Sequence, residues 1–295
     1  MPSDKVKNYI HLHFLVVIAG FTAVLGELIS LEAVPLVWYR MSIGSLLMVI
    51  YIKYKKISLR VPLKVLFRFS VAGIIIALHW ITFFAAIKAS NISITLAMFS
   101  TGAFFASLIE PFFFKRKIIG YEILFGLIVI IGVILITQTE FRYILGIILG
   151  ISSALFSTLF AVLNGKFVEE YPPSIISFYE FISGVVFMSI FLALNGDGFN
   201  TAYFQLSSSD WINLFILASI CTAYAFVASV HVMKYITPYT VVLTYNLEPI
   251  YGIVLALFLF PESETMRPLF YIGACLIIFT VLLNAVFKNI KKTKI

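Results

Sequence analysis

The sequence has little charge and almost no cysteine. Only 12% of its 295 residues are charged, whereas 61% are hydrophobic and the mean hydropathy is +1.05. Soluble domains carry about 25% charged residues, so this balance excludes an ordinary water-soluble enzyme. The two cysteines, Cys221 and Cys275, both lie within apolar runs. This placement supports neither a disulfide framework nor a cysteine metal cluster.

The sequence also lacks the motifs of nucleotide- and metal-dependent proteins. No glycine-rich phosphate loop is present, and the few His and Asp residues are scattered. We therefore predict no enzyme activity, no cofactor and no metal site. The net charge of +7 could suit nucleic acid, but basic residues beside membrane spans more often set topology. The partners we predict are the lipid bilayer and a small-molecule substrate, with protons as a further candidate.

Long hydrophobic runs occupy nearly the whole chain. A helix needs about 20 mainly apolar residues to cross a bilayer. Ten segments meet this need: 9–29, 34–54, 65–87, 92–114, 119–137, 143–163, 174–195, 211–231, 238–260 and 268–287. The first has no small-residue cleavage site, so we interpret it as a span and not as a signal peptide. The predicted fold class is an all-α membrane protein with ten transmembrane helices.

The distribution of basic residues predicts the orientation. With the N terminus in the cytoplasm, 17 of the 21 Lys and Arg residues fall on the cytoplasmic side. The other four are Arg40, inside the second span, and Lys88, Arg142 and Arg267 at outer loops. This asymmetry follows the positive-inside rule and predicts that both termini are cytoplasmic. The location we expect is the plasma (inner) membrane of a bacterium.

The chain repeats itself weakly. Ala86-Ile87-Lys88 lies over Val232-Met233-Lys234 at an offset of 146, and each triplet ends a helix. Gly126 similarly falls over Gly273 at an offset of 147. We predict two five-helix repeats, residues 1–139 and 140–295. Because five is odd, the second copy enters the membrane from the opposite side, which gives the inverted repeat of many secondary transporters.

Three features carry a resemblance to a known family: Arg40 inside the second helix, the helix end Ala85-Ala86-Ile87-Lys88, and Leu247-Glu248-Pro249 in the ninth helix. In this order they resemble the drug/metabolite transporter superfamily, specifically ten-helix carriers of the EamA type. The resemblance covers nearly the whole length. It implies transport of amino acids, other small metabolites or drugs through a central cavity lined mainly by helices one, three, four, six, eight and nine.

We therefore predict a secondary transporter, most simply an exporter, of small organic metabolites such as amino acids. An inverted repeat suits alternating access to a central site. The alternative is a passive facilitator or a channel-like pore. A channel would more naturally show rings of charge or a carbonyl filter, and the sequence shows neither. Substrate, coupling and oligomeric state stay open at this point.

Glu248 is the first candidate for the substrate or proton path. It lies about ten residues into the ninth span, and Pro249 frees the Tyr245 carbonyl from its helical hydrogen bond. Together with Asn246 and Tyr245, it could bind a substrate amine or carry a proton. The alternative is a hydrogen-bonded structural residue at a proline kink.

Arg40 and Glu27 form a second candidate pair. Both lie six or seven residues from the middle of the first outer turn, so a rise of about 1.5 Å per residue places them at similar depth. An ion pair in an outer gate, or recognition of a substrate carboxylate by Arg40, would follow. The alternative is that Arg40 extends to the membrane surface and only orients its helix.

Aromatic and imidazole side chains give the remaining candidates. His79 and Trp80 fall in the outer half of the third span, and Tyr224 lies in the eighth. Trp and Tyr have a polar group to satisfy and so favour a cavity more than Phe does, while His79 could titrate near neutral pH. Simple packing is the alternative for each. Glu180 is expected to face the cytoplasmic mouth.

Overall fold

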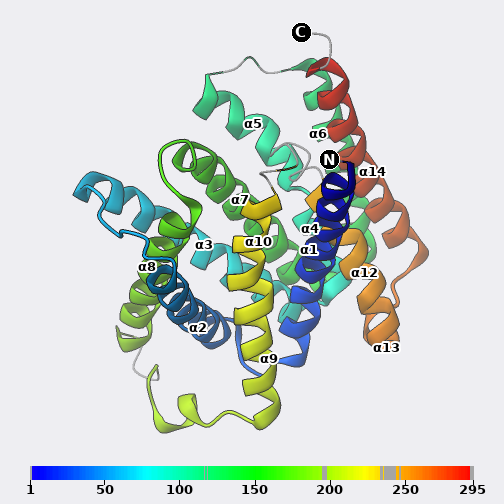
Figure 1. Cartoon of the computed structure of the whole chain (residues 1–295). Helices are drawn as coiled ribbons and strands as arrows, with labels where there is room; N and C mark the ends of the chain where they lie inside the picture. The colour runs from blue at the N-terminus through cyan, green and yellow to red at the C-terminus, as the bar shows by residue number, and fades with distance from the viewer. Residues whose placement is uncertain are drawn as a thin grey trace.

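The computed structural model describes residues 2–115, 117, 119–194, 198–232, 235, 244, 245 and 247–292. Within these residues the fold is all-helical and has no strand (Figure 1). The helices of the N-terminal part are α1 (Pro2–Leu28), α2 (Ala33–Tyr54), α3 (Leu63–Ala89), α4 (Ile92–Phe99), α5 (Gly102–Phe114) and α6 (Gly120–Thr139).

The C-terminal part repeats this succession with different breaks. It contains α7 (Ile144–Phe167), α8 (Pro173–Leu194), α9 (Ser208–Ala218), η3 (Ser219–Tyr224), α10 (Ala225–Val232), α12 (Glu248–Leu259), α13 (Pro261–Glu264) and α14 (Pro268–Lys292). Two short 3₁₀ turns, η1 (Phe141–Tyr143) and η2 (Thr201–Phe204), complete it. The first turn precedes α7 and the second lies between α8 and α9.

Eight helical segments among the described residues are long and apolar enough to cross a membrane. They match the first eight predicted spans, with α4 and α5 together forming the fourth and α9, η3 and α10 the eighth. The ninth and tenth predicted spans correspond to shorter apolar helices, Glu248–Leu259 and Pro268–Asn284. Much of the start of the ninth, residues 238–243 and 246, lies outside the described residues.

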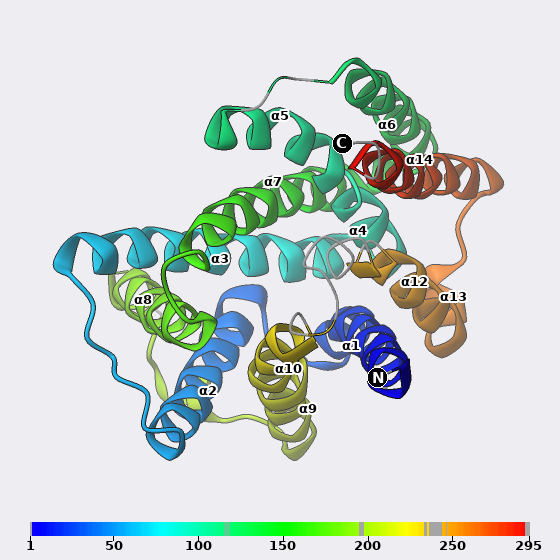
Figure 2. The same cartoon turned by 45° about the horizontal axis from the view of Figure 1, so that its top comes forward.

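Helix contacts in one half have counterparts in the other, as expected of two repeats that pack against each other. α3 packs against α7, and the equivalent helices α9 and α10 pack against α1. α3 also contacts α8, as α9 contacts α2. The pairs α2 with α8, α4 with α12 and α6 with α14 each join a helix to its own equivalent. In Figure 2, α6 and α14 run side by side at one edge of the bundle. Each half therefore completes the packing of the other.

The fourth span is broken where hydroxyl side chains compete for its backbone. Ser100 Oγ donates to the Leu96 carbonyl at 2.9 Å, and Thr101 Oγ1 donates to the Met98 carbonyl at 2.7 Å. Such local bonds weaken and bend helices. The Gly102 carbonyl just after the break accepts a hydrogen bond from Thr158 Oγ1 of α7 at 3.1 Å. A neighbouring helix thus supplies a donor that lipid would not.

Two glycines allow α6 and α14 to touch. A Cβ atom added at Gly132 would lie 2.9 Å from the Gly273 carbonyl oxygen, and one at Gly273 would lie 2.8 Å from the Gly132 oxygen. Glycine permits such close backbone approach, which drives helix association in lipid through van der Waals contact. The pair joins the fifth predicted span to the tenth, and thus the two halves.

Replacement of Gly132 tests this contact. We expect Gly132→Ala to lower the free energy of unfolding by about 1–3 kcal/mol, since the added methyl forces the two backbones apart. Thermal unfolding in detergent measures the effect. Gly120→Ala is the matched control, because a Cβ atom there meets nothing within 4 Å. Equal melting temperatures for the two variants would contradict the close-packing account.

Candidate functional site

A π-helix places the first site residue. η3 spans Ser219–Tyr224 in the middle of the eighth span, and π-helical turns occur frequently at functional sites. Thr222, inside this turn, donates its hydroxyl to the Leu217 carbonyl five residues earlier at 2.8 Å. The same oxygen accepts a hydrogen bond from Arg40 Nε of α2 at 2.9 Å. The Thr222 hydroxyl in this turn thus donates to its own helix and accepts from a buried arginine.

Arg40 is an ionisable residue buried in the bundle interior. It is only 4% exposed, and an ionisable group at this depth needs compensation of several kcal/mol. Its guanidinium carbon lies 3.9 Å from the centre of the Trp80 ring, so a cation–π contact supplies part of it. Among the described residues, however, Arg40 Nη1 has no hydrogen-bond partner. One strong donor for an anionic group is left over.

Glu248 lies within electrostatic range of this guanidinium. Glu248 is the first residue of α12 and Pro249 is the second, where a backbone N–H would have no intrahelical partner in any case. The charges of Arg40 and Glu248 interact, but no direct ion pair joins these two described side chains. Tyr245, also near Glu248, shares a hydrogen bond of 2.7 Å with Ser229 Oγ. The predicted site residue Asn246 lies outside the described residues.

His79 extends the same polar centre toward α7. Its Nδ1 lies 2.9 Å from Ser153 Oγ and 3.1 Å from the Ser153 carbonyl oxygen. The ring stacks on Phe99 with a centroid distance of 5.4 Å. It also lies within electrostatic range of Arg40. The imidazole is thus oriented by one helix and covered by another.

The structure brings together five of the predicted residues: Arg40, Trp80, His79, Glu248 and Tyr245. Two others lie apart. Tyr224 is 42% exposed and bonds His11 through its hydroxyl at 2.7 Å. Glu27 and Arg40, both within the described chain, form no ion pair, so that hypothesis is wrong. Similar depth did not bring them together, because the Arg40 side chain points toward α3 and η3.

The idea that Arg40 extends to the membrane surface is also wrong, because the side chain is buried between helices. Sequence reasoning also misplaced Glu180. Instead of facing a mouth, its side chain is fully buried, and Oε1 accepts a hydrogen bond from Asn164 Nδ2 at 2.8 Å. Its Oε2 has no hydrogen-bond partner among the described residues.

Two further site residues, Thr222 and Ser153, were missed. Single hydroxyl residues in apolar runs are common and usually bond their own helix. Their role at the site depends on the side chains of Arg40 and His79 from other helices. The sequence gives the positions of those helices along the chain but not how they pack. No local signal could therefore have identified Thr222 and Ser153.

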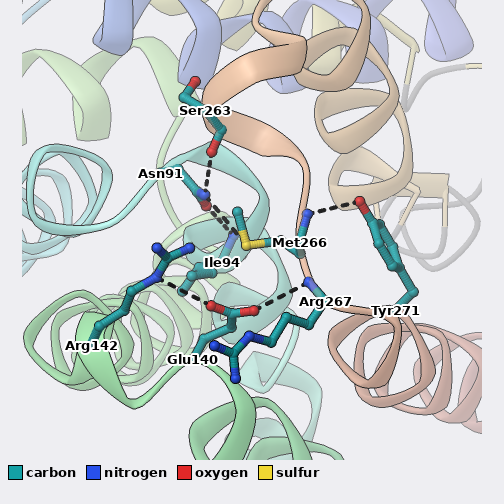
Figure 3. Close-up of polar contacts among 8 residues, drawn as sticks. All are labelled: Asn91, Ile94, Glu140, Arg142, Ser263, Met266, Arg267 and Tyr271. Carbon is teal, nitrogen blue, oxygen red and sulfur yellow. Dashed lines mark hydrogen bonds and ion pairs between the residues drawn. The ribbon is translucent and has the colours of Figure 1, made fainter.

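One end of the bundle is held by polar contacts between distant segments (Figure 3). Asn91 caps α4 by accepting from Ile94 N at 2.9 Å, and its Nδ2 donates to the Ser263 carbonyl at 3.0 Å. The Glu264 carboxylate of α13 accepts from Ile92 N at 2.9 Å and Ser93 N at 2.8 Å. The second half thus satisfies N–H groups that the start of a helix leaves free.

Three cations predicted at outer loops all make contacts at this same end. The Arg267 backbone N–H donates to Glu140 Oε1 at 3.3 Å, and Arg142 Nε lies 3.5 Å from Glu140 Oε2 (Figure 3). Lys88 Nζ donates to the Ile29 carbonyl at 2.7 Å. We call these contacts, together with those of Asn91 and Glu264, the tied end. It lies about 40 Å from the start of α3, given the 27 residues of that helix.

The EamA-like transporter family matches the chain twice, over residues 8–138 and 144–286. The chain belongs to the EamA-like transporter family. The predicted resemblance is confirmed, and the two matches confirm a repeat. Because members of this family are membrane transporters, the EamA-family protein is an integral membrane protein of a transport family.

The fold is also known. Solved structures contain 22 matching chains. One of them, described only as "Crystal structure of protein", aligns with a TM-score of 0.65 and 14% sequence identity, covering 95% of this chain and 99% of that chain. At this identity the likeness extends to the fold alone. A search of curated proteins finds no match.

The bond between Thr222 and Arg40 can be tested in the EamA-family protein by Thr222→Val. The variant keeps the shape of the side chain but leaves Arg40 Nε without its acceptor. We expect the free energy of unfolding to fall by about 1–3 kcal/mol, the usual cost of an unsatisfied buried polar group. Thermal unfolding in detergent provides the measurement. Thr139→Val, which removes only a bond to Leu135 within one helix, should change stability less; the reverse order would refute the assignment.

The tied end can be tested by Glu264→Gln. The amide offers one acceptor oxygen where the carboxylate offers two, and it loses the favourable charge at the start of α4. We expect hydrogen exchange of the Ile92 and Ser93 amides to accelerate roughly fivefold, as about 1 kcal/mol of capping predicts. Mass spectrometry of peptides from this region measures it. Glu262→Gln, an exposed residue of the same short helix, should leave exchange there unchanged.

Proposed function

We propose that this protein is a secondary transporter of small zwitterionic metabolites, such as amino acids, and that it works as an exporter by alternating access. The proposal includes ten spans in two inverted repeats, residues 1–139 and 140–295, with both termini in the cytoplasm. It also places the protein in the inner membrane of a bacterium. The family, the eight long apolar helices and the matching helix contacts of the two halves support this arrangement.

The observation that carries the substrate proposal is Arg40 Nη1, which has no hydrogen-bond partner among the described residues. A buried guanidinium with a free N–H forms its best bond with a carboxylate. Glu248 lies within electrostatic range without neutralising Arg40 directly. A substrate with a carboxylate and an ammonium group would satisfy both residues at once. Neither a purely cationic nor a purely anionic solute would do so.

Thr222, Trp80 and His79 would give this site its fixed geometry. Thr222 sets the orientation of the guanidinium through Nε, and the Trp80 ring covers one face of it. The ring of His79, held by Ser153, adds a polar wall beside the Phe99 ring. Binding groups that are already oriented lose less entropy when a substrate arrives.

Alternating access requires the two ends of the path to open in turn. The tied end would be the outer gate, because its contacts join α4 to α13, which lie in opposite halves. Opening would exchange the Glu264 bonds to backbone N–H groups for water. These bonds are few and lie near the membrane surface, so the exchange costs less than it would in the bilayer core.

Transport by reconstituted protein tests the proposal. We expect proteoliposomes to carry labelled neutral amino acids, and Arg40→Gln to weaken substrate affinity about tenfold to a hundredfold, as for a lost hydrogen bond to a charged group. Glu248→Gln should lower affinity for amino acids but affect their des-amino analogues less. Arg60→Gln and Glu262→Gln, both at exposed positions, are the matched controls.

The same proteoliposomes show whether substrate transport is coupled to a proton gradient. An imposed pH gradient should drive substrate accumulation by the wild type and fail to drive it in Glu248→Gln, if this carboxyl carries the proton. Flux that never exceeds equilibration under any gradient would instead identify a passive facilitator. Full activity of Arg40→Gln toward every zwitterion tested would rule out the proposed site.

A further inference from the structure

A large groove opens at the end of the bundle opposite the tied end. Its volume is about 800 Å³, and it is lined by the first two turns of α3, the last residues of α5 and the end of α7. Figure 2 shows α7 lying between α3 and α5, and both helices contact it. α7 therefore forms the floor of the groove, and the other two helices form its walls.

Charged side chains line the groove from three segments. Arg68 comes from α3, Lys115 follows the end of α5, and Lys166 lies in the last turn of α7. No ion pair joins these three cations to a carboxylate among the described residues, and all three are exposed. Glu169 and Glu170 also line the groove. Among the described lining residues, three cations and two carboxylates leave a net charge of +1, which matches a single phosphodiester.

Aromatic side chains surround these charges. Phe113 and Phe167 belong to the lining, and Lys166 Nζ lies 5.9 Å from the centre of the Phe113 ring. Phe67, also in the lining, is 70% exposed. Val71, one turn further along α3 toward the bilayer core, continues this apolar surface. A ligand here would contact cations at the membrane surface and apolar side chains below them.

We propose that this groove binds one anionic phospholipid of the cytoplasmic leaflet. Its phosphate would lie among Arg68, Lys115 and Lys166, and an acyl chain would follow Phe67 and Val71 along α3. Basic pockets between transmembrane helices on the cytoplasmic side are suited to phospholipid head groups. The groove lies at the start of α3, the end where the positive-inside rule places the cytoplasm. The site does not depend on what the carrier transports.

Native mass spectrometry of the full-length protein in detergent tests the proposal. We expect one phosphatidylglycerol to bind more tightly than phosphatidylcholine or phosphatidylethanolamine. Arg68→Gln and Lys166→Gln should each weaken phosphatidylglycerol binding about fivefold, since a basic residue near an anionic lipid contributes on the order of a fivefold change in affinity. Lys166→Arg, which preserves the charge, should retain the binding.

The matched control is Lys53→Gln, which removes an exposed cation at the same end but outside the groove. Its phosphatidylglycerol affinity should equal that of the wild type. Equal binding of the three lipids, or equal losses for Lys53→Gln and Lys166→Gln, would overturn the proposal. So would variants that lose substrate binding in lipid-free detergent while phosphatidylglycerol binding stays unchanged, because the groove would then belong to the transport path. Lys115→Gln provides a further test if either other variant fails to fold.

Discussion

The burial of one positive charge inside an apolar bundle is the constraint on which the polar interior depends. A bilayer offers a guanidinium neither water nor counterion, so protein groups must stabilise its charge. Arg40 has a hydroxyl at Nε and an aromatic ring against its face. The hydroxyl stands in the right place because η3 is a π-helix. The π-helical turn of the second half thus provides the acceptor for Arg40 of the first half.

The two halves interact differently at the centre and at the tied end. In the centre, their contacts leave Arg40 Nη1 without a hydrogen-bond partner among the described residues. At the tied end, backbone N–H groups at the start of α4 donate hydrogen bonds to the side chains of Asn91 and Glu264. In the proposed transport cycle, the bonds of the tied end would have to break before that end opens, whereas the centre would gain a hydrogen bond when a solute binds.

The sequence predicted the fold well because its signals are local or additive. Apolar runs near 20 residues locate the first eight spans, and weak offsets near 146 already indicate a repeat. Arg40 and Glu248 stood out in the sequence as candidates because ionisable residues within such runs are rare. The rotation of each helix has no comparable signal in one sequence, since mean apolarity barely varies around helices such as α2. The expected contact between Arg40 and Glu27 therefore failed, and the contact with Thr222 was missed.

The separation of Arg40 from Glu248 has a consequence for transport. A direct ion pair would satisfy both groups, and a solute would then have to break a strong bond before forming its own. Thr222 and Trp80 instead hold the guanidinium, and Nη1 has no hydrogen-bond partner among the described residues. In the proposed transport site, each charged group would then interact with a solute without first breaking such a bond. A substrate carboxylate bound at Nη1 would also stabilise the bundle, because a ligand that binds only the folded state adds to its stability.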